Sequence, residues 1–285
     1  MRKQALLVFG VYCLLAGSTW LGEAQLAPEW PGLLRLCAHD VLLTGLFGLI
    51  AWRRGERISL RRGAEAGWWC GLMFAAAPVV AAGAGGRVSS LTQVLVLSLV
   101  PVPTVLALGY RRDHEEGLRL LLPVLAGTGG LALLVPYAFP GSGLGWSWFA
   151  AVSATAIALA WAGIRLNEML QEEPVFLTAA LGSGVAALAS GIGWRFLEAG
   201  PVEIHVRQVG VELAWALAVD GSLALMMVWL SKKTGPVSFS MRFLLLPWVN
   251  LVGGIVVMRP EVSWTSVFGL ALTAGAVGYV LVTDS

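Results

Sequence analysis

Charge is scarce in this chain. Asp, Glu, Lys and Arg make up 13% of its 285 residues, whereas a soluble domain of this length carries about 25%. Hydrophobic residues make up 57%, and the mean hydropathy is +0.77. A soluble core has no room for so much apolar sequence, so the sequence predicts a membrane protein whose surroundings are the lipid bilayer. The net charge of +2 gives no indication of nucleic-acid binding.

Patterns typical of catalysis and metal binding are also missing. The three cysteines, Cys13, Cys37 and Cys70, lie in apolar segments without CxxC spacing, as small buried hydrophobic residues do. The glycine pairs at 129–130 and 253–254 are not followed by the Lys-Ser/Thr of a phosphate-binding loop. No histidine pair has metal-ligand spacing, and no Ser-His-Asp or Cys-His set falls at one membrane depth. We therefore expect no enzyme, no metal and no cofactor.

Long apolar runs divide the chain into ten predicted transmembrane helices. A helix needs about 20 apolar residues to cross hydrocarbon, and runs of this length that do not alternate exclude strands. The first run is expected to remain as a span rather than act as a signal peptide, because no small-residue cleavage site precedes a polar domain. The predicted spans are 5–22, 33–52, 67–85, 88–109, 118–137, 146–166, 175–197, 209–230, 237–258 and 263–282.

Arginine and lysine indicate the orientation of these spans. With a cytoplasmic N-terminus, thirteen of the 19 basic residues fall on the inner side and five on the outer side, with Arg242 inside a span. Cytoplasmic loops carry such an excess. The inner segment 167–173 departs from the pattern because Glu168, Glu172 and Glu173 dominate it. The sequence predicts a multi-pass protein of the cell (inner) membrane with both termini cytoplasmic.

The two halves of the chain follow a similar plan. Residues 5–137 and 146–282 each hold five spans, and an odd number makes the second half enter from the opposite side. Similar halves of this kind form an inverted repeat. One register pairs Val88-Ser89 with Val237-Ser238, whereas another pairs Pro101 with Pro247. The sequence alone leaves the register open.

Three stretches resemble parts of one transporter family. They are AGSTWLGEAQL (16–26), SLALMMVWLSKKTGPVSFSMRFLLLPW (222–248) and EVSWTSVFGLALTAGAVGYVLV (261–282). Together they resemble the EamA branch of the drug/metabolite transporter (DMT) superfamily. The resemblance implies an all-α integral membrane protein with ten transmembrane helices in two inverted five-helix repeats, at 1–140 and 141–285. It also implies a central cavity and export or exchange of a small metabolite.

The chain departs from that family at two places. The second helix of the family usually carries an Arg followed by an aromatic residue, but here the sequence reads Cys37-Ala38-His39-Asp40-Val41. The family also has an acidic residue after its ninth helix. Here that place reads Met258-Arg259-Pro260, and the acidic residue Glu261 comes two positions after Arg259. The first departure exchanges a cation for an anion near the pathway, so no substrate is carried over from better-known members.

Asp220 is the strongest candidate for a functional residue. It lies near the middle of an apolar span, where a charge costs roughly 2.5–3.5 kcal/mol on insertion scales. It could anchor a substrate or carry a proton, or it could form a structural ion pair, with Arg242 as the candidate partner. Arg242 in turn could bind an anionic group, although snorkelling to the inner surface is the favoured interpretation.

His39 and Asp40 form a second candidate group some seven residues inside the second span. Asp40 could pair with Arg35 or orient the His39 imidazole. Adjacent residues point about 100° apart on a helix, so a direct His39–Asp40 pair would be strained. Snorkelling of both side chains toward the outer interface is the alternative that we favour.

Four uncharged residues complete the candidate substrate-binding or coupling set. Gln93 and Asn250 are polar groups in the fourth and ninth spans, where they could bind substrate or join helices by hydrogen bonds. Trp20 and Trp161 each lie fifteen residues beyond the start of the first span of their half.

The sequence thus predicts a secondary transporter, expected to export or exchange a small metabolite by alternating access. No nucleotide-binding motif is present, so an ion gradient, for which a coupling proton is one candidate, or the substrate gradient would supply the energy. The alternative is a non-transporting membrane protein that uses the same scaffold to bind a partner. A homodimer is left open. A membrane-embedded enzyme is the third reading, and no catalytic set supports it.

Overall fold

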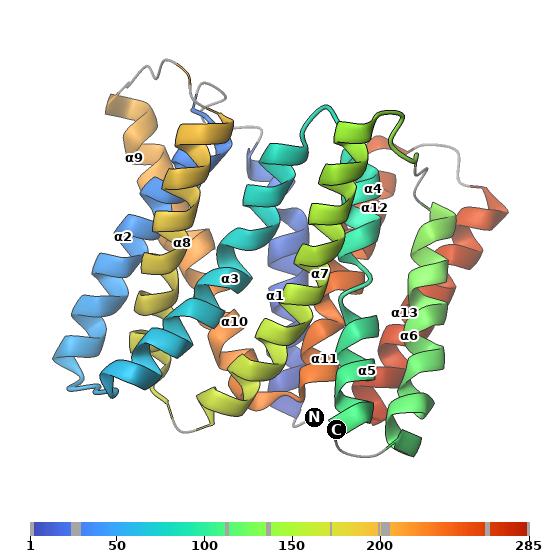
Figure 1. Cartoon of the computed structure of the whole chain (residues 1–285), viewed down its shortest axis with the longest axis horizontal. Coiled ribbons are helices and arrows are strands. Elements are labelled where there is room, and N and C mark those ends of the chain that lie inside the picture. Colours follow the sequence, from blue (N-terminus) through green and yellow to red (C-terminus); the bar gives the residue numbers. More distant parts are fainter. Residues whose placement is uncertain are drawn as a thin grey trace. The chain divides into compact units, whose positions relative to one another are not determined.

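The protein is helical throughout the part that its computed structural model describes (Figure 1). The described residues are 3–23, 30–111, 114–134, 138–171, 173–198, 200, 206–259 and 263–283, without the side chains of residues 20, 22, 23, 111, 114–118, 206 and 207. The predicted Glu261 lies outside these residues.

Ten helical segments follow one another in chain order, each overlapping one predicted span. Three segments contain a break or a change of helix type and therefore carry more than one label. The segments are α1 (Lys3–Glu23), α2 (Gly32–Arg53), α3 (Leu60–Ala84), α4 with α5 (Ser90–Leu97, Pro101–Arg111), α6 (His114–Leu134), α7 (Gly143–Leu170), α8 (Val175–Leu197), α9 with η1 and α10 (Val206–Trp215, Ala216–Asp220, Gly221–Lys233), α11 with α12 (Pro236–Ser240, Arg242–Met258) and α13 (Trp264–Thr283).

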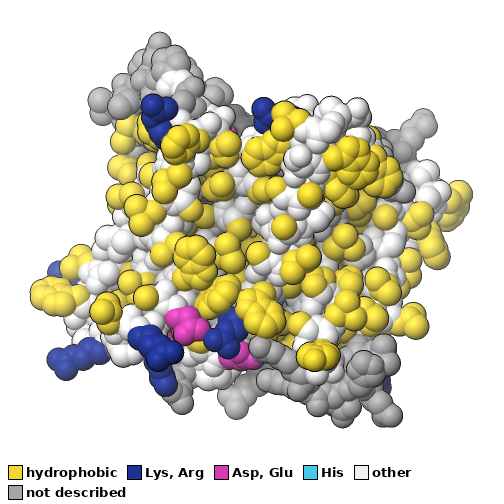
Figure 2. All heavy atoms as spheres, in the orientation of Figure 1, with side chains coloured by type: hydrophobic (Ala, Val, Ile, Leu, Met, Phe, Trp, Pro, Cys, Tyr) yellow, Lys and Arg dark blue, Asp and Glu magenta, His cyan; other side chains and the backbone are white. Residues whose placement is uncertain are grey.

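Most of these segments can cross a bilayer. Eight helices among the described residues are long and apolar enough to do so, and Lys3–Thr19 and Arg119–Leu134 are shorter apolar helices. Figure 2 shows a face covered mainly by hydrophobic side chains, with charged side chains toward its edges. By helix length and hydropathy the protein is a multi-pass membrane protein, as the sequence predicts.

Local sequence explains where several helices begin and end. Ser89 caps α4, because its hydroxyl accepts a hydrogen bond from the backbone N–H of Thr92 at 3.2 Å. Pro101 opens α5 after the break that ends α4. Pro236 occupies the first turn of α11 behind Gly235, where its missing N–H removes no helix bond. The end of α10 at Lys233 and the start of α11 at Pro236 agree to within three residues with the predicted spans 209–230 and 237–258.

The chain divides into two compact units that do not follow the sequence halves. Unit 1 contains residues 1–18, 84–164 and 233–285, and unit 2 contains residues 19–83 and 165–232. Unit 1 therefore holds most of α1 and α7, together with α4–α6 and α11–α13. Unit 2 holds α2, most of α3, α8 and α9–η1–α10. The proposed repeats at 1–140 and 141–285 stay a prediction and are distinct from these units.

Within unit 2, small residues let α8 approach two neighbours closely. Gly182, Ala186 and Ser190, which recur at every fourth residue of α8, are buried. A Cβ atom added at Gly71 of α3 would lie 2.5 Å from the Val185 side chain of α8. On the α2 side, a Cβ at Gly191 would lie 3.2 Å from Cys37 Sγ. The helices of unit 2 are thus held at distances that larger residues would prevent.

Within unit 1, α6 and α13 pack through glycines in a similar way. A Cβ at Gly130 would lie 2.8 Å from the backbone oxygen of Gly269, and one at Gly269 would lie 2.7 Å from that of Gly130. The Thr273 hydroxyl donates to the Gly127 carbonyl at 3.1 Å. The Ala271-Gly275 and Ala274-Gly278 pairs of α13, which also have a four-residue spacing, are exposed. This spacing alone therefore does not identify the helix face that meets a partner.

Substitution of Gly71 by alanine should lower the stability of unit 2. The added methyl group would meet the Val185 side chain at 2.5 Å and the Gly182 carbonyl oxygen at 3.0 Å, and overpacking of this kind costs about 1–3 kcal/mol. Gly45→Ala on α2 is the matched control, because nothing lies within 4 Å of its added Cβ. Thermal unfolding in detergent should show a loss for Gly71→Ala and no loss for Gly45→Ala. Equal stabilities would contradict the α3–α8 contact.

Candidate functional site

A buried histidine lies between two carboxylates in unit 2. His39 of α2 is 4% exposed. Its Nδ1 lies 2.6 Å from Oδ2 of Asp220, and its Nε2 lies 3.0 Å from Oε2 of Glu212. All three residues belong to helices long and apolar enough to span a membrane. We call His39, Glu212 and Asp220 the charge cluster.

The charge cluster forms because α2 and the start of α10 come close together. Gly221 follows Asp220, and a Cβ atom added there would lie 3.0 Å from the Leu43 side chain of α2. Leu43 is one turn beyond His39 and is itself buried. A larger residue at position 221 would push the two helices apart, so the glycine allows Asp220 to reach the imidazole.

A π-helical turn, η1, aligns the two carboxylates on one side of their helix. In a regular α-helix, residues eight apart differ in direction by about 80°, whereas residues seven apart differ by about 20°. The Gly221 N–H bonds to the Ala216 carbonyl five residues back, which inserts one extra residue into the helix. Glu212 and Asp220 therefore face the same way although they are eight residues apart. π-Helical turns of this kind occur frequently at functional sites.

Asp40 adds a third acidic group to this region. Its carboxylate interacts electrostatically with that of Asp220, and its backbone carbonyl accepts a hydrogen bond from the Thr44 hydroxyl at 2.7 Å. The structure thus brings three of the predicted residues, His39, Asp40 and Asp220, into one neighbourhood. The favoured prediction that His39 reaches out to the interface was wrong, because Asp220 and Glu212 bind both of its ring nitrogens within unit 2.

Glu212 was missed by the sequence reasoning. It lies inside the predicted span 209–230, it is 2% exposed, and it contacts His39 directly. A second acid in the same span as Asp220 was the available signal, since each such charge is costly in lipid. The eight-residue separation concealed it, because regular helical geometry does not place Glu212 and Asp220 on one face.

Arg242 lies in unit 1, whereas Asp220 lies in unit 2. It is 2% exposed, and its guanidinium carbon lies 3.8 Å from the ring centroid of Phe239 and 4.8 Å from that of Phe243. Stacking on aromatic faces stabilises a cation. The snorkelling interpretation of Arg242 was therefore wrong. The ion pair between Arg242 and Asp220 stays a prediction, while Asp220 bonds to His39.

The four uncharged candidates stay predictions as site residues. Gln93 is buried, and its amide donates to the Val88 carbonyl at 2.9 Å, which closes the turn before α4. Asn250 is exposed on α12, and Trp161 on α7 is 40% exposed. The side chain of Trp20 lies outside the described residues.

Glu168 and Glu173 of the acidic segment 167–173 belong to an ion-pair network in unit 2. Arg165 bonds to Glu65 at 2.8 Å and to Glu168 at 3.1 Å, and Arg62 bonds to Glu173 at 3.2 Å. The Lys232 ammonium donates to the Glu173 backbone oxygen at 2.9 Å. These acids thus neutralise basic residues on neighbouring segments, which accounts for an acidic stretch on the side predicted to be basic.

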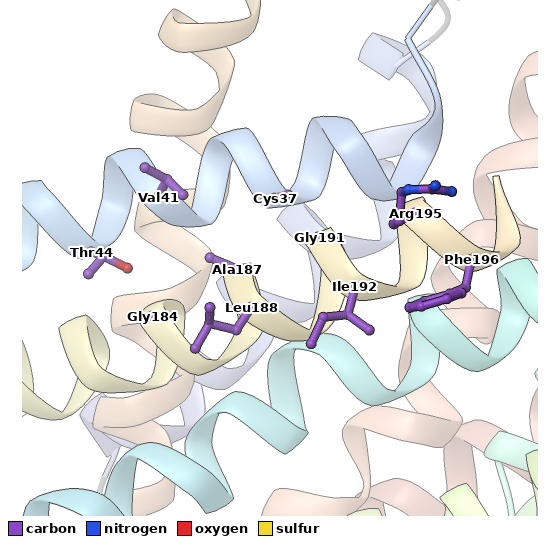
Figure 3. A pocket seen from close by; sticks show the side chains of 10 residues that line it. All are labelled: Cys37, Val41, Thr44, Gly184, Ala187, Leu188, Gly191, Ile192, Arg195 and Phe196. Carbon is purple, nitrogen blue, oxygen red and sulfur yellow. The ribbon is translucent and has the colours of Figure 1, made fainter. Parts of the chain in front are cut away.

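An apolar groove with a volume of about 550 Å³ runs between α2 and α8 (Figure 3). Small residues of both helices line it, including Cys37, Gly184 and Gly191, and Leu188 and Ile192 stand exposed beside them. Arg195 is the one charged residue among its lining residues. The groove lacks the ionisable groups of the charge cluster, which is therefore the better candidate site.

Comparison with known proteins identifies a shared fold. A solved crystal structure, described only as that of a protein, aligns over 99% of this chain and 97% of its own, with a TM-score of 0.73 and 15% sequence identity. At this identity the likeness shows the fold alone. No known family pattern matches the chain. No curated protein matches it either.

Proposed function

We propose that the protein is a secondary transporter that moves a small metabolite by alternating access. The charge cluster carries this proposal. Ionisable groups inside transmembrane helices are costly, and in membrane proteins they mark substrate pathways and proton relays. A cluster of one histidine and two carboxylates, joined at 2.6 and 3.0 Å within apolar spans, is expensive for a protein that uses its helices as a scaffold alone.

The composition of the two units supports the inverted repeat on which this proposal draws. Unit 2 holds helical segments two, three, seven and eight in chain order, and unit 1 holds most of the other six. Each of the first five segments therefore shares a unit with the segment five positions later in the chain: segments two and seven, for example, both belong to unit 2. Two repeats related by a two-fold axis would produce this pairing.

Contacts within the units support the same symmetry. The α2 helix packs on α8, which pairs segments two and seven, and α6 packs on α13, which pairs segments five and ten. In both cases a segment contacts its own counterpart, as segments beside a two-fold axis do. The contact of α3 with α8 has its counterpart in the contact of α10 with α2 through Gly221. The EamA-like arrangement, 1–140 and 141–285, is therefore part of the proposal.

An inner-membrane location with cytoplasmic termini is also part of the proposal. The start of α1 and the end of α13 belong to unit 1, and Figure 1 draws both at the same edge. An even number of membrane crossings places both termini on the same side of the membrane. The excess of basic residues then assigns that edge to the cytoplasm.

Alternating access can be tested with single cysteines labelled from either side of the membrane. The three native cysteines would first be replaced by alanine, and cysteine would then replace Gln93 or Asn250. We expect a membrane-impermeant maleimide to label each position from both sides, because a transporter opens to each side in turn. Arg54→Cys, at the end of α2, is the control and should react from one side.

Two outcomes separate transport from the alternative. Labelling from both sides supports alternating access. If Gln93→Cys and Asn250→Cys both react from one side alone, in a protein that is folded and inserted, the scaffold is static. In that case the partner-binding alternative is favoured and the transport proposal fails.

A further inference from the structure

The geometry of the charge cluster fixes how many protons it holds. A neutral imidazole has one N–H donor and one acceptor nitrogen, whereas an imidazolium has two donors. Both ring nitrogens of His39 lie within hydrogen-bond distance of a carboxylate oxygen. Either the imidazole carries both protons, or it carries one and the carboxyl group facing the other nitrogen carries the second. The two hydrogen bonds together therefore require two protons.

Loss of one of these protons must break a hydrogen bond. With a single proton left, one ring nitrogen and the carboxylate oxygen facing it would both present lone pairs. At a distance of 2.6 or 3.0 Å such a contact is repulsive, so the two groups would separate. The number of bound protons thus determines whether α2 stays joined to both carboxylates of the α9–η1–α10 segment.

The arrangement is unsuited to a single metal ion. The two nitrogens of an imidazole ring point away from each other, and Glu212 and Asp220 each contact a different nitrogen. One ion bound to a ring nitrogen could not reach both carboxylates. A proton, in contrast, can be held in each of the two short contacts.

The two carboxylates differ in their access to the surroundings. The Glu212 side chain is 2% exposed, whereas the Asp220 side chain is 28% exposed. Asp220 also ends the π-helical turn, and turns of this kind occur frequently at functional sites. Proton exchange should therefore begin at the bond between Asp220 and His39 Nδ1.

Other ionisable groups lie on α2 and on the helix packed against it. On α2, Arg35, Cys37 and Asp40 are near His39 in the sequence, and the Asp40 carboxylate interacts electrostatically with Asp220. Arg195 is on α8, which packs against α2, and Glu198, just after α8, accepts a hydrogen bond from the Leu33 backbone N–H at 2.7 Å. These groups carry charges of both signs.

We infer that the charge cluster is a proton-binding site and that its exchangeable proton is the coupling ion of transport. The proton on His39 Nδ1 passes to Oδ2 of Asp220 and leaves from there, and the Nδ1–Oδ2 contact opens. Rebinding of a proton closes it again. The coupling role of the proton rests on the proposed transport function, but proton binding itself can be measured without any transport.

Nitrogen-15 NMR can observe these protons directly. The chain has three histidines, so the variant His114→Asn/His205→Asn, labelled in histidine and reconstituted in lipid, reports on His39 alone. In a titration over about pH 5–8, we expect Nδ1 to change from a protonated to an unprotonated signal while Nε2 keeps its proton. No substrate is required.

Matched variants identify the partner of each nitrogen. Asp220→Asn should alter the Nδ1 signal, and Glu212→Gln should alter the Nε2 signal, because amides replace carboxylates at those contacts. Glu168→Gln, a carboxylate in the separate ion-pair network, should change neither. A His39 spectrum that is constant over this pH range, or that is unaffected by both cluster variants, would overturn the inference. Failure of the cysteine test with a normal NMR titration would instead overturn transport and leave the proton site intact.

Discussion

Substitution of His39 by alanine should lower the free energy of unfolding by about 3–5 kcal/mol. The change removes a hydrogen-bond partner from both Asp220 and Glu212, which lie 2.6 and 3.0 Å from the ring. Removing one member of a buried charged group leaves the remaining charges uncompensated, and this costs more than the lost contacts themselves. The effect should be among the largest that a single substitution produces in this chain.

The measurement is equilibrium unfolding in mixed micelles, followed by circular dichroism. Val41→Ala on the same helix is the matched control; Val41 is 59% exposed, and its truncation should change stability by less than about 0.5 kcal/mol. His39→Gln should be less harmful, since its amide can donate to one carboxylate. A loss no larger than that of Val41→Ala would contradict the cluster.

Helix positions could be predicted from the sequence because hydrocarbon imposes one simple rule. A long apolar run must be helical, and all ten predicted spans coincide with helical segments. The start of α11 at Pro236 was also predicted to within one residue, because proline is favoured in the first turn of a helix. Local chemistry decides these features.

The contacts between helices could not be predicted in the same way. The pairing of His39 with Glu212 depends on how α2 faces α9, and hydropathy carries no such information in lipid. The π-helical turn at Ala216–Asp220 changes the direction of every later residue of its segment by about 100°. None of its residue types is specific for a π-helix, so the sequence does not predict the turn. Arg242 shows the same limit, since its burial on Phe239 follows from packing rather than from its position near a helix start.

Substitution of Asp220 by asparagine should abolish gradient-driven accumulation while the protein stays folded. Asparagine keeps the size of the side chain, and its oxygen can still accept the proton of His39 Nδ1, but it cannot ionise. A proton delivered to position 220 would then have no carboxylate to receive it. The alternative hypothesis, in which Asp220 only forms a structural ion pair with Arg242, predicts a different result. Asp220→Asn alone would then destabilise the protein, and the addition of Arg242→Gln would restore stability and transport.

The most direct test of a proton-coupled transporter uses liposomes that contain the purified protein and carry a pH gradient. They would be incubated with a defined mixture of amino acids, nucleosides, nucleobases and organic amines, and the retained compounds measured by mass spectrometry. A gradient of about two pH units stores about 2.7 kcal/mol per proton, enough for accumulation of about 100-fold at most. We expect at least one compound to accumulate by about tenfold or more over protein-free liposomes, and a protonophore or Asp220→Asn to abolish this. Accumulation that survives both, or that fails to exceed protein-free liposomes for every compound, would contradict the account.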